Sequence, residues 1–258
     1  MLPDSLLHAL LIVCPLVFLG GIVDSVAGGG GLITLPAYLL AGLSPHAAAA
    51  TNKCGNLWGT LLATFRFLRR GEVHLPSALW GGAGALLGAW LGARLNLIVS
   101  DRFLYYLMLV IVPVMAVFLL VKREFGTEDR SCTLPKRRLM LLSFAIGLVI
   151  GGYDGFFGPG AGTFLILAFT ALCRFDLLTA SGNTKVANAA SNAASLVTFA
   201  LAGQVVWAVG IPAALCSLAG GYVGSGLALK NGAKVIRPMF FVVLALLTIR
   251  LLYDLLFS

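Results

Sequence analysis

The sequence predicts an all-α polytopic membrane protein made of two homologous inverted repeats with glycine-rich broken or re-entrant helices. Hydrophobic residues make up 59% of the 258 residues and charged residues 11%, whereas a soluble domain carries roughly 25% charged residues. The mean hydropathy is +0.97, and the apolar residues gather in separate segments. Short polar motifs recur in both halves of the chain at a nearly constant distance, which indicates an internal duplication.

The apolar segments alternate with short polar connections. In the first half they cover residues 6–23, 32–43, 47–67, 75–91 and 103–121. In the second half they cover residues 139–153, 163–173, 178–202, 205–229 and 235–256. Segments 32–43 and 163–173 are shorter than the ~20 residues that a helix needs to span a bilayer. Both follow glycine-rich stretches, so we predict that they are broken or re-entrant helices.

The two halves repeat the same motifs in the same order. Asp24-Ser-Val-Ala-Gly-Gly-Gly-Gly31 corresponds to Asp154-Gly-Phe-Phe-Gly-Pro-Gly-Ala161, 130 residues later. Thr51-Asn-Lys-Cys-Gly-Asn56 corresponds to Asn183-Thr-Lys-Val-Ala-Asn188, 132 residues later. Chance matches would not keep nearly one offset along the chain. We therefore divide the chain into a first membrane repeat (1–121), a cytoplasmic linker (122–138) and a second membrane repeat (139–258).

The distribution of basic residues predicts the orientation in the membrane. With the N-terminus outside, 13 Lys and Arg residues fall in inner loops or at inner helix ends, and three (Arg94, Arg102 and Arg250) fall at the outer side. Such a bias is typical of cytoplasmic loops. It also accounts for the net charge of +8 without a nucleic-acid partner. The partners expected from the sequence are the lipid bilayer and a small anionic substrate.

Two lysines lie within apolar segments at equivalent places. A lysine at the centre of a membrane helix costs about 2.5–3.5 kcal/mol. The spacing from Lys185 through Asn188 and Asn192 to Ser195 places these residues on one helical face. The first repeat has a matching face, which contains Lys53, Asn56 and Thr60.

Two interpretations of these polar faces remain open. They could join helices by interhelical hydrogen bonds. Alternatively, they line a wet cavity in which the lysines attract an anion. We favour the cavity because amides or hydroxyls would join helices at a lower cost than a cation. The candidate substrate-binding residues on these segments are Asn52, Lys53, Asn56, Asn183, Lys185, Asn188 and Asn192.

The glycine-rich breaks provide a second set of candidate binding groups. Backbone N–H groups at a helix N-terminus bind anions, and glycine allows a ligand to approach the backbone closely. We therefore add Gly29, Gly30, Gly158 and Gly160 to the candidate site. Asp24 and Asp154 adjoin the two breaks. They could cap the chain locally, pair with the lysines or carry a coupled proton, and we favour capping or pairing.

The same motifs resemble the sulfite exporter TauE/SafE family over nearly the whole chain. GGGGLITLPAYLLAGLSPHAAAAT resembles the first-repeat signature of the family, and YDGFFGPGAGTFLILAF and NTKVANAASN resemble a branch described as probable membrane transporters. The resemblance implies a multi-pass carrier of the bacterial inner membrane, exporting sulfite, sulfonates or related organosulfur anions. Asn52-Lys53 replaces the Ser-Leu pair of many members, a difference that bears on which anion is carried.

The sequence features favour one of three functional classes. A secondary transporter of small anions agrees best with the duplicated lysines, and the chain has no nucleotide-binding Walker A motif. An anion channel is the main alternative. Asp24 and Tyr153-Asp154 superficially resemble an intramembrane aspartyl protease, but the GxGD motif is absent. We therefore predict no enzyme activity, no catalytic or metal-binding residues and no cofactor. The anion, the transport direction, the coupling ion and the oligomeric state stay open.

The inverted repeat predicts the location of two marker sites. Each repeat has an odd number of segments, so the linker at 122–138 should be cytoplasmic and Ser258 should be periplasmic. Reporters that are active on one side of the membrane, fused within the linker and after Ser258, measure this directly. A cytoplasmic signal at the C-terminus would rule out the arrangement of five plus five segments.

Overall fold

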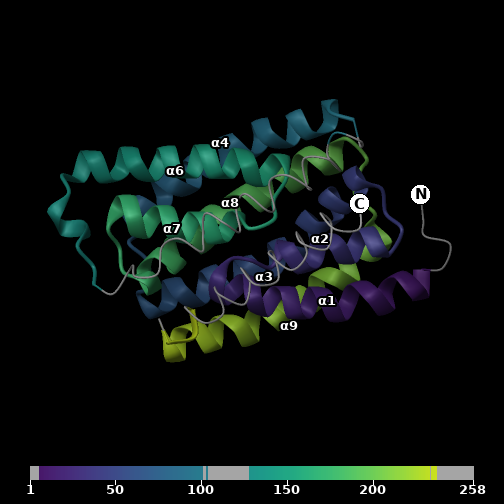
Figure 1. The fold of residues 1–258 in the computed structure, drawn as a ribbon, viewed down its shortest axis with the longest axis horizontal. Coiled ribbons are helices and arrows are strands. Elements are labelled where there is room, and N and C mark those ends of the chain that lie inside the picture. The colour runs from purple at the N-terminus through teal and green to yellow at the C-terminus, as the bar shows by residue number, and fades with distance from the viewer. Residues whose placement is uncertain (1–5, 101–102, 104–127, 233, 237–258) are drawn as a thin grey trace, which may run out of the picture.

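The computed structural model describes residues 6–100, 103, 128–232 and 234–236, and these form a bundle of long helices (Figure 1). The helices are α1 (Leu6–Ala27), α2 (Gly31–Leu40), α3 (Pro45–Arg70), α4 (Leu75–Ile98), α6 (Lys136–Phe156), α7 (Ala161–Cys173), α8 (Leu177–Leu201) and α9 (Trp207–Asn231), with a short 3₁₀ turn, η1 (Ser131–Thr133). The segments predicted at 103–121 and 235–256 lie almost entirely outside the described residues, as does linker stretch 122–127.

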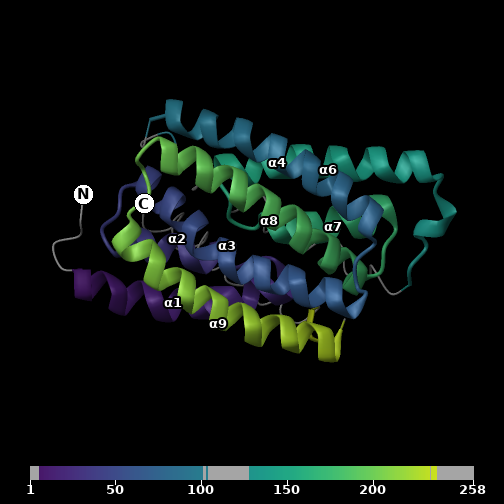
Figure 2. The same cartoon turned by 180° about the vertical axis from the view of Figure 1, so that it is seen from behind.

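The prediction of a helical membrane protein is confirmed. The described residues contain helices, turns and loops but no strand. Three of the described helices, Leu6–Ala27, Lys136–Phe156 and Trp207–Asn231, are long and apolar enough to cross a membrane. The long helices lie roughly parallel to the long axis of the bundle (Figures 1 and 2).

Local signals in the sequence define the ends of the two central helices. Ser44 caps α3 by accepting a hydrogen bond from the Ala47 amide at 3.4 Å, and Pro45 occupies the first helical position. Gly71 ends this helix in the left-handed conformation, with φ of 73°. Asp176 caps α8 by accepting hydrogen bonds from the amides of Leu178 and Thr179.

The predicted glycine-rich breaks separate helices in both halves. The chain leaves helical geometry between α1 and α2, where Gly28 has φ of 75°. It does so again between α6 and α7, where Gly158 and Gly160 have φ of 101° and 80°. The breaks touch each other, since the Thr163 amide and hydroxyl donate hydrogen bonds to the carbonyls of Gly28 and Ala27 at 3.2 and 2.9 Å. Two segments distant in sequence thus meet at one point.

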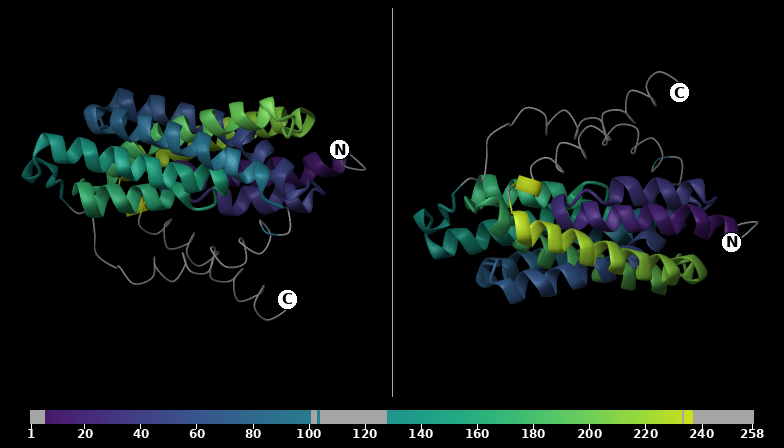
Figure 3. Two further views of the ribbon diagram at one scale, coloured as in Figure 1. Left: turned by 90° about the horizontal axis from the view of Figure 1, so that it is seen from above. Right: turned by 90° about the horizontal axis from the view of Figure 1, so that it is seen from below.

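The helices pack as two outer pairs around a central pair. α4 packs against α6 on one side, α1 packs against α9 on the other, and α3 contacts α8 between them (Figures 1 and 3). Glycines form the contact surface of both outer pairs. Gly84, Gly88 and Gly92 of α4 lie on the backbone of α6, and Gly220 and Gly224 of α9 lie on the backbone of α1. Such small residues allow membrane helices to approach closely.

We expect an added methyl group to separate α4 from α6. In Gly88→Ala the new Cβ would overlap the Leu148 carbonyl, and overpacking of this kind costs about 1–3 kcal/mol. Gly82→Ala is the matched control, because its Cβ would meet Val186 at an ordinary 3.5 Å. Thermal unfolding in detergent should show a lower midpoint for Gly88→Ala and little change for Gly82→Ala. Equal midpoints would contradict the packing described here.

Candidate functional site

The central helices α3 and α8 bring both predicted lysines into the interior. Lys53 is 3% exposed and Lys185 is fully buried. Small residues surround them on their own helices, including Gly55, Gly182 and Ala187. Gly182 leaves room for the Glu72 backbone and Gly55 for the Tyr38 hydroxyl, so neighbouring segments lie close to both helices.

Lys53 forms a buried ion pair with Asp154 of the other half. The Lys53 Nζ lies 2.7 Å from Asp154 Oδ1, and the two side chains are 4% and 5% exposed. Ser191 of α8 donates a hydrogen bond to the second carboxylate oxygen. A Cβ at Gly158 would lie 3.5 Å from both Lys53 Nζ and Asp154 Oδ1. A side chain at this position would therefore lie directly against the ion pair.

Lys185 makes the mirrored contact, but with a different acceptor. Its Nζ donates a hydrogen bond to the main-chain carbonyl of Asp24. The Asp24 side chain lies directly against Gly30, whose Cβ would come 2.5 Å from Asp24 Cβ. Each half thus contributes a lysine that reaches the aspartate position of the other half. We expected the aspartates to pair with the lysines, and Asp154 forms such an ion pair with Lys53.

A small polar pocket lies among these groups. It is lined by Asp24, Gly28, Gly31, Asn52, Lys53, Asn56, Asp154, Gly158, Gly162, Asn188 and Asn192. The free space holds about one water molecule. Its walls come from α1, α3, α6, α8, the first turns of α2 and α7 and the two glycine-rich breaks, so residues of both halves meet at one cavity.

The amides of this pocket fall into two groups. On α3, Asn52 accepts hydrogen bonds from Thr34 at 2.6 Å and from Asn56 at 3.0 Å. On α8, neither Asn188 nor Asn192 forms a side-chain hydrogen bond with another described residue, although they are only 5% and 4% exposed. Buried amides normally have partners. The α8 amides are therefore free to bind a small polar ligand in the pocket.

Some predicted site residues do not line the pocket. These are Gly29, Gly30, Gly160, Lys185 and Asn183. Asn183 accepts a hydrogen bond from the His74 amide at 3.0 Å and donates one to Ser77 at 3.0 Å, which fixes the start of α4. Its equivalent, Thr51, accepts a hydrogen bond from the Val206 amide at 3.1 Å at the start of α9. This position therefore joins helices in both halves.

Sequence reasoning missed several groups around the site. Gly28, Gly31 and Gly162 line the pocket, and the Thr34 and Ser191 hydroxyls hold Asn52 and Asp154. The glycine-rich motifs contained the first three, but spacing alone does not tell which glycine faces the cavity. Gly59 stands at the position equivalent to Ser191, so the internal repeat carried no signal for that hydroxyl.

A pocket of this composition can bind an anion. Lys53 supplies a positive charge, and the Asn188 and Asn192 amides supply hydrogen-bond donors. The N-termini of α2 and α7 lie beside it, and the first-turn amides of a helix favour negative charge. In the present conformation Lys53 is paired with Asp154, so a bound anion would have to compete with this carboxylate for the lysine.

Comparisons with known proteins agree on one family. The family model for sulfite exporter TauE/SafE matches residues 13–251. A probable membrane transporter protein YfcA of Escherichia coli K12 is 41% identical over 92% of this chain and 87% of its own. A probable membrane transporter protein ORF9 of Sinorhizobium is 39% identical over 97% and 95%, and one of Haemophilus influenzae is 36% identical over 92% of each. No solved structure matches.

Removing one charge of the buried ion pair should lower the stability of the protein more than removing both charges. Lys53→Met leaves the Asp154 carboxylate buried without its cation, which costs about 3–5 kcal/mol. In Lys53→Met/Asp154→Asn no charge remains, and an amide oxygen can still accept the Ser191 hydrogen bond. Thermal unfolding of both single variants and the double variant gives the coupling. Strictly additive losses would show that the pair is not coupled.

Proposed function

Because the chain belongs to the sulfite exporter TauE/SafE family of membrane transporters, we propose that it is a secondary transporter that exports a small anion. Sulfite, sulfonates or related organosulfur anions are the proposed substrates. The bacterial inner membrane is the proposed location, with both termini outside. The transporter class follows from the family, whereas the anion, its direction and the site are our proposals.

The observation that carries this proposal is a pair of buried amides beside Lys53 whose side chains form no hydrogen bond with another residue in the described part of the chain. Asn188 and Asn192 face the same polar pocket as the lysine. Of the two carboxylates in the lining, Asp154 is paired with Lys53 and Asp24 interacts electrostatically with Lys185, so neither is free for a cation. An oxyanion that displaces Asp154 would instead find the Lys53 cation, amide donors and two helix N-termini.

We further propose that the substrate displaces Asp154 from Lys53. The carboxylate in the present conformation holds the position that the anion takes during transport. Once released, Asp154 would be an unpaired charge inside the membrane, which is costly. It is therefore a candidate carrier of a coupled proton, and Asp24 is its candidate counterpart in the other half.

The two halves would act as inverted repeats that alternate access to this site. Several contacts support this arrangement. The pairing of α4 with α6 mirrors the pairing of α9 with α1, and α3 contacts its own equivalent, α8. In this scheme α2 and α7 are the broken or re-entrant helices, and they approach the site from opposite sides. Lys185, now bound to the Asp24 carbonyl, would replace Lys53 in the pocket when the transporter faces the other side.

The anion channel is distinguished from a carrier by its kinetics. A carrier that closes around its substrate gives saturable flux, whereas an open pore does not. The small free space in the central pocket favours a carrier, because an ion cannot pass through this conformation without rearrangement. The buried Lys53–Asp154 pair also gives Asp154 a partner other than Asp24, which does not favour the protease alternative.

Flux into proteoliposomes tests the proposed function. Sulfite, sulfate, thiosulfate and a sulfonate are screened with a pH gradient and a membrane potential imposed separately. We expect saturable flux of at least one of these anions, and a decrease of tenfold or more in Lys53→Met and Lys185→Met, because each removes a positive charge from one state of the site. Lys185→Arg should retain at most part of the flux.

The matched control for these variants is Lys136→Met, which removes an exposed lysine at the start of α6. It should transport like the unmodified protein. Wild-type flux and substrate affinity in both Lys53→Met and Lys185→Met would refute the site. Absence of flux for every anion tested, in a protein that is correctly folded, would refute the proposed substrate class.

A further inference from the structure

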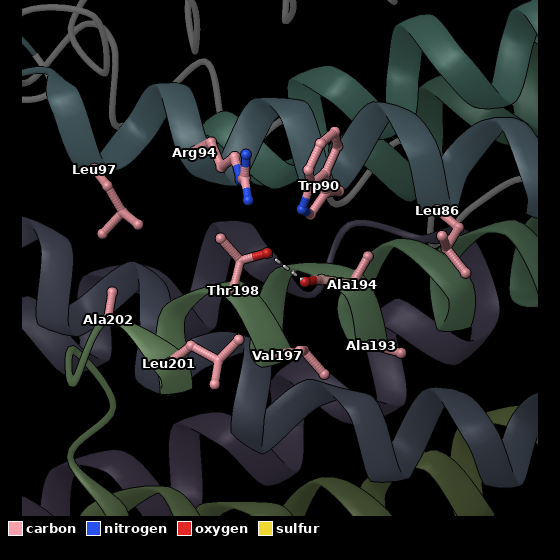
Figure 4. A pocket seen from close by; sticks show the side chains of 10 residues that line it. All are labelled: Leu86, Trp90, Arg94, Leu97, Ala193, Ala194, Val197, Thr198, Leu201 and Ala202. Atoms are coloured by element: carbon pink, nitrogen blue, oxygen red, sulfur yellow. Dashed lines mark hydrogen bonds between the residues drawn. The ribbon is translucent and has the colours of Figure 1, made fainter.

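Two surface grooves occupy equivalent positions at opposite ends of the bundle. The inner groove lies between α3 and α9 and is lined by Phe65, Arg66, Arg69, Arg70, Leu229 and Lys230, together with Gly226. The outer groove lies between α8 and α4, and its lining includes Val197, Thr198, Leu201, Ala202, Arg94 and Leu97 (Figure 4). The linings correspond by the 132-residue repeat. These α8 residues of the outer groove lie 132 positions after the α3 residues of the inner groove. Arg94 and Leu97 of α4 lie 132 positions before Gly226 and Leu229 of α9.

The two grooves differ in charge. At the positions of Arg66, Arg69 and Arg70, the outer groove has Thr198, Leu201 and Ala202. The inner groove therefore carries four cations with Lys230, whereas the outer groove carries one, Arg94. None of the described residues that line the inner groove is acidic. Glu72, in the turn after α3, interacts electrostatically with Arg70 but does not line the groove.

Neutral groups hold the innermost cation of this groove. Arg66 donates hydrogen bonds to the Tyr222 carbonyl and, at 2.9 Å, to Ser225 Oγ, and its guanidinium lies 4.4 Å from the centre of the Tyr222 ring. A Cβ at Gly226 would come 3.1 Å from Arg66 Nη2, so glycine leaves space for the guanidinium. In the outer groove Arg94 stacks on Trp90, the equivalent of Tyr222, at 4.2 Å.

Apolar side chains continue the inner groove toward the middle of the bundle. Phe65 and Tyr222 are 52% and 61% exposed, and Leu61 and Leu218 lie one turn earlier on the same faces of α3 and α9 and are also exposed. A cationic cluster next to an exposed apolar face matches a molecule with an anionic head and a hydrocarbon tail. Basic pockets between helices at the cytoplasmic side are suited to anionic lipid headgroups.

We propose that the inner groove binds the phosphate headgroup of an anionic phospholipid of the cytoplasmic leaflet. Arg69, Arg70 and Lys230 contact the phosphate, Arg66 forms the floor, and an acyl chain lies along Phe65 and Tyr222. The leaflet follows from the orientation proposed above, in which the basic helix ends face the cytoplasm. The equivalent outer groove has one cation, Arg94, in place of four, and provides an internal comparison.

Binding of dioleoyl phosphatidylglycerol to the detergent-purified protein tests this site by native mass spectrometry and by thermal stabilisation. Phosphatidylethanolamine and glycerol 3-phosphate are the comparison ligands. The test variant combines Arg69→Gln, Arg70→Gln and Lys230→Gln, all exposed positions, and leaves Arg66 intact. We expect its dissociation constant for phosphatidylglycerol to rise on the order of 100-fold. Arg94→Gln, in the outer groove, should bind like the unmodified protein.

Each contrary outcome has a separate meaning. Equal binding of phosphatidylethanolamine would overturn charge recognition, and equal binding of glycerol 3-phosphate would overturn a lipid in favour of a soluble anion. Unchanged phosphatidylglycerol binding in a correctly folded triple variant would overturn the location. The measurement needs neither flux nor a defined orientation, so its failure is distinct from failure of the proposed transport function.

Discussion

The buried ion pair between Lys53 and Asp154 is the interaction on which the rest of the structure depends. Two charges removed from water are costly, and their attraction offsets this cost only with good geometry and further hydrogen bonds. Here the distance is 2.7 Å, and Ser191 contributes one of the additional bonds. Because the partners come from different halves, the two repeats must stay in contact for either charge to be satisfied.

Close contact between backbones makes this charge pairing possible. Gly28 lies directly on Gly162, where a Cβ on either would overlap the other's backbone. The two breaks therefore touch at the centre and bring α1 and α6 close to α3 and α8. Larger residues here would separate the halves and lengthen the distance that each lysine must span. Gly28 and Gly162 thus serve the same constraint as the ion pair.

Much of this arrangement could be predicted from the sequence, because duplication exposes it. The motifs around Lys53 and Lys185 identified the central helices, and the glycine-rich motifs located both breaks. The pocket geometry could not be predicted in the same way. Side chains at equivalent positions meet different partners, since Lys53 pairs with the Asp154 carboxylate whereas Lys185 donates to the Asp24 main-chain carbonyl. Ser191 has glycine as its equivalent, so the repeat could not reveal it.

The departures from symmetry are as informative as the symmetry. Asp154 has both a lysine and a hydroxyl as partners, whereas the Asp24 position offers its main-chain carbonyl to Lys185. A perfectly symmetric pair of repeats would give two end states of equal energy. Ser191 corresponds to Gly59 in the other half, so the two lysine environments are unequal. In the proposed scheme one conformation would therefore be favoured in the absence of substrate. In the proposed mechanism, an anion that displaces Asp154 would remove that advantage, so that binding itself would promote the conformational change.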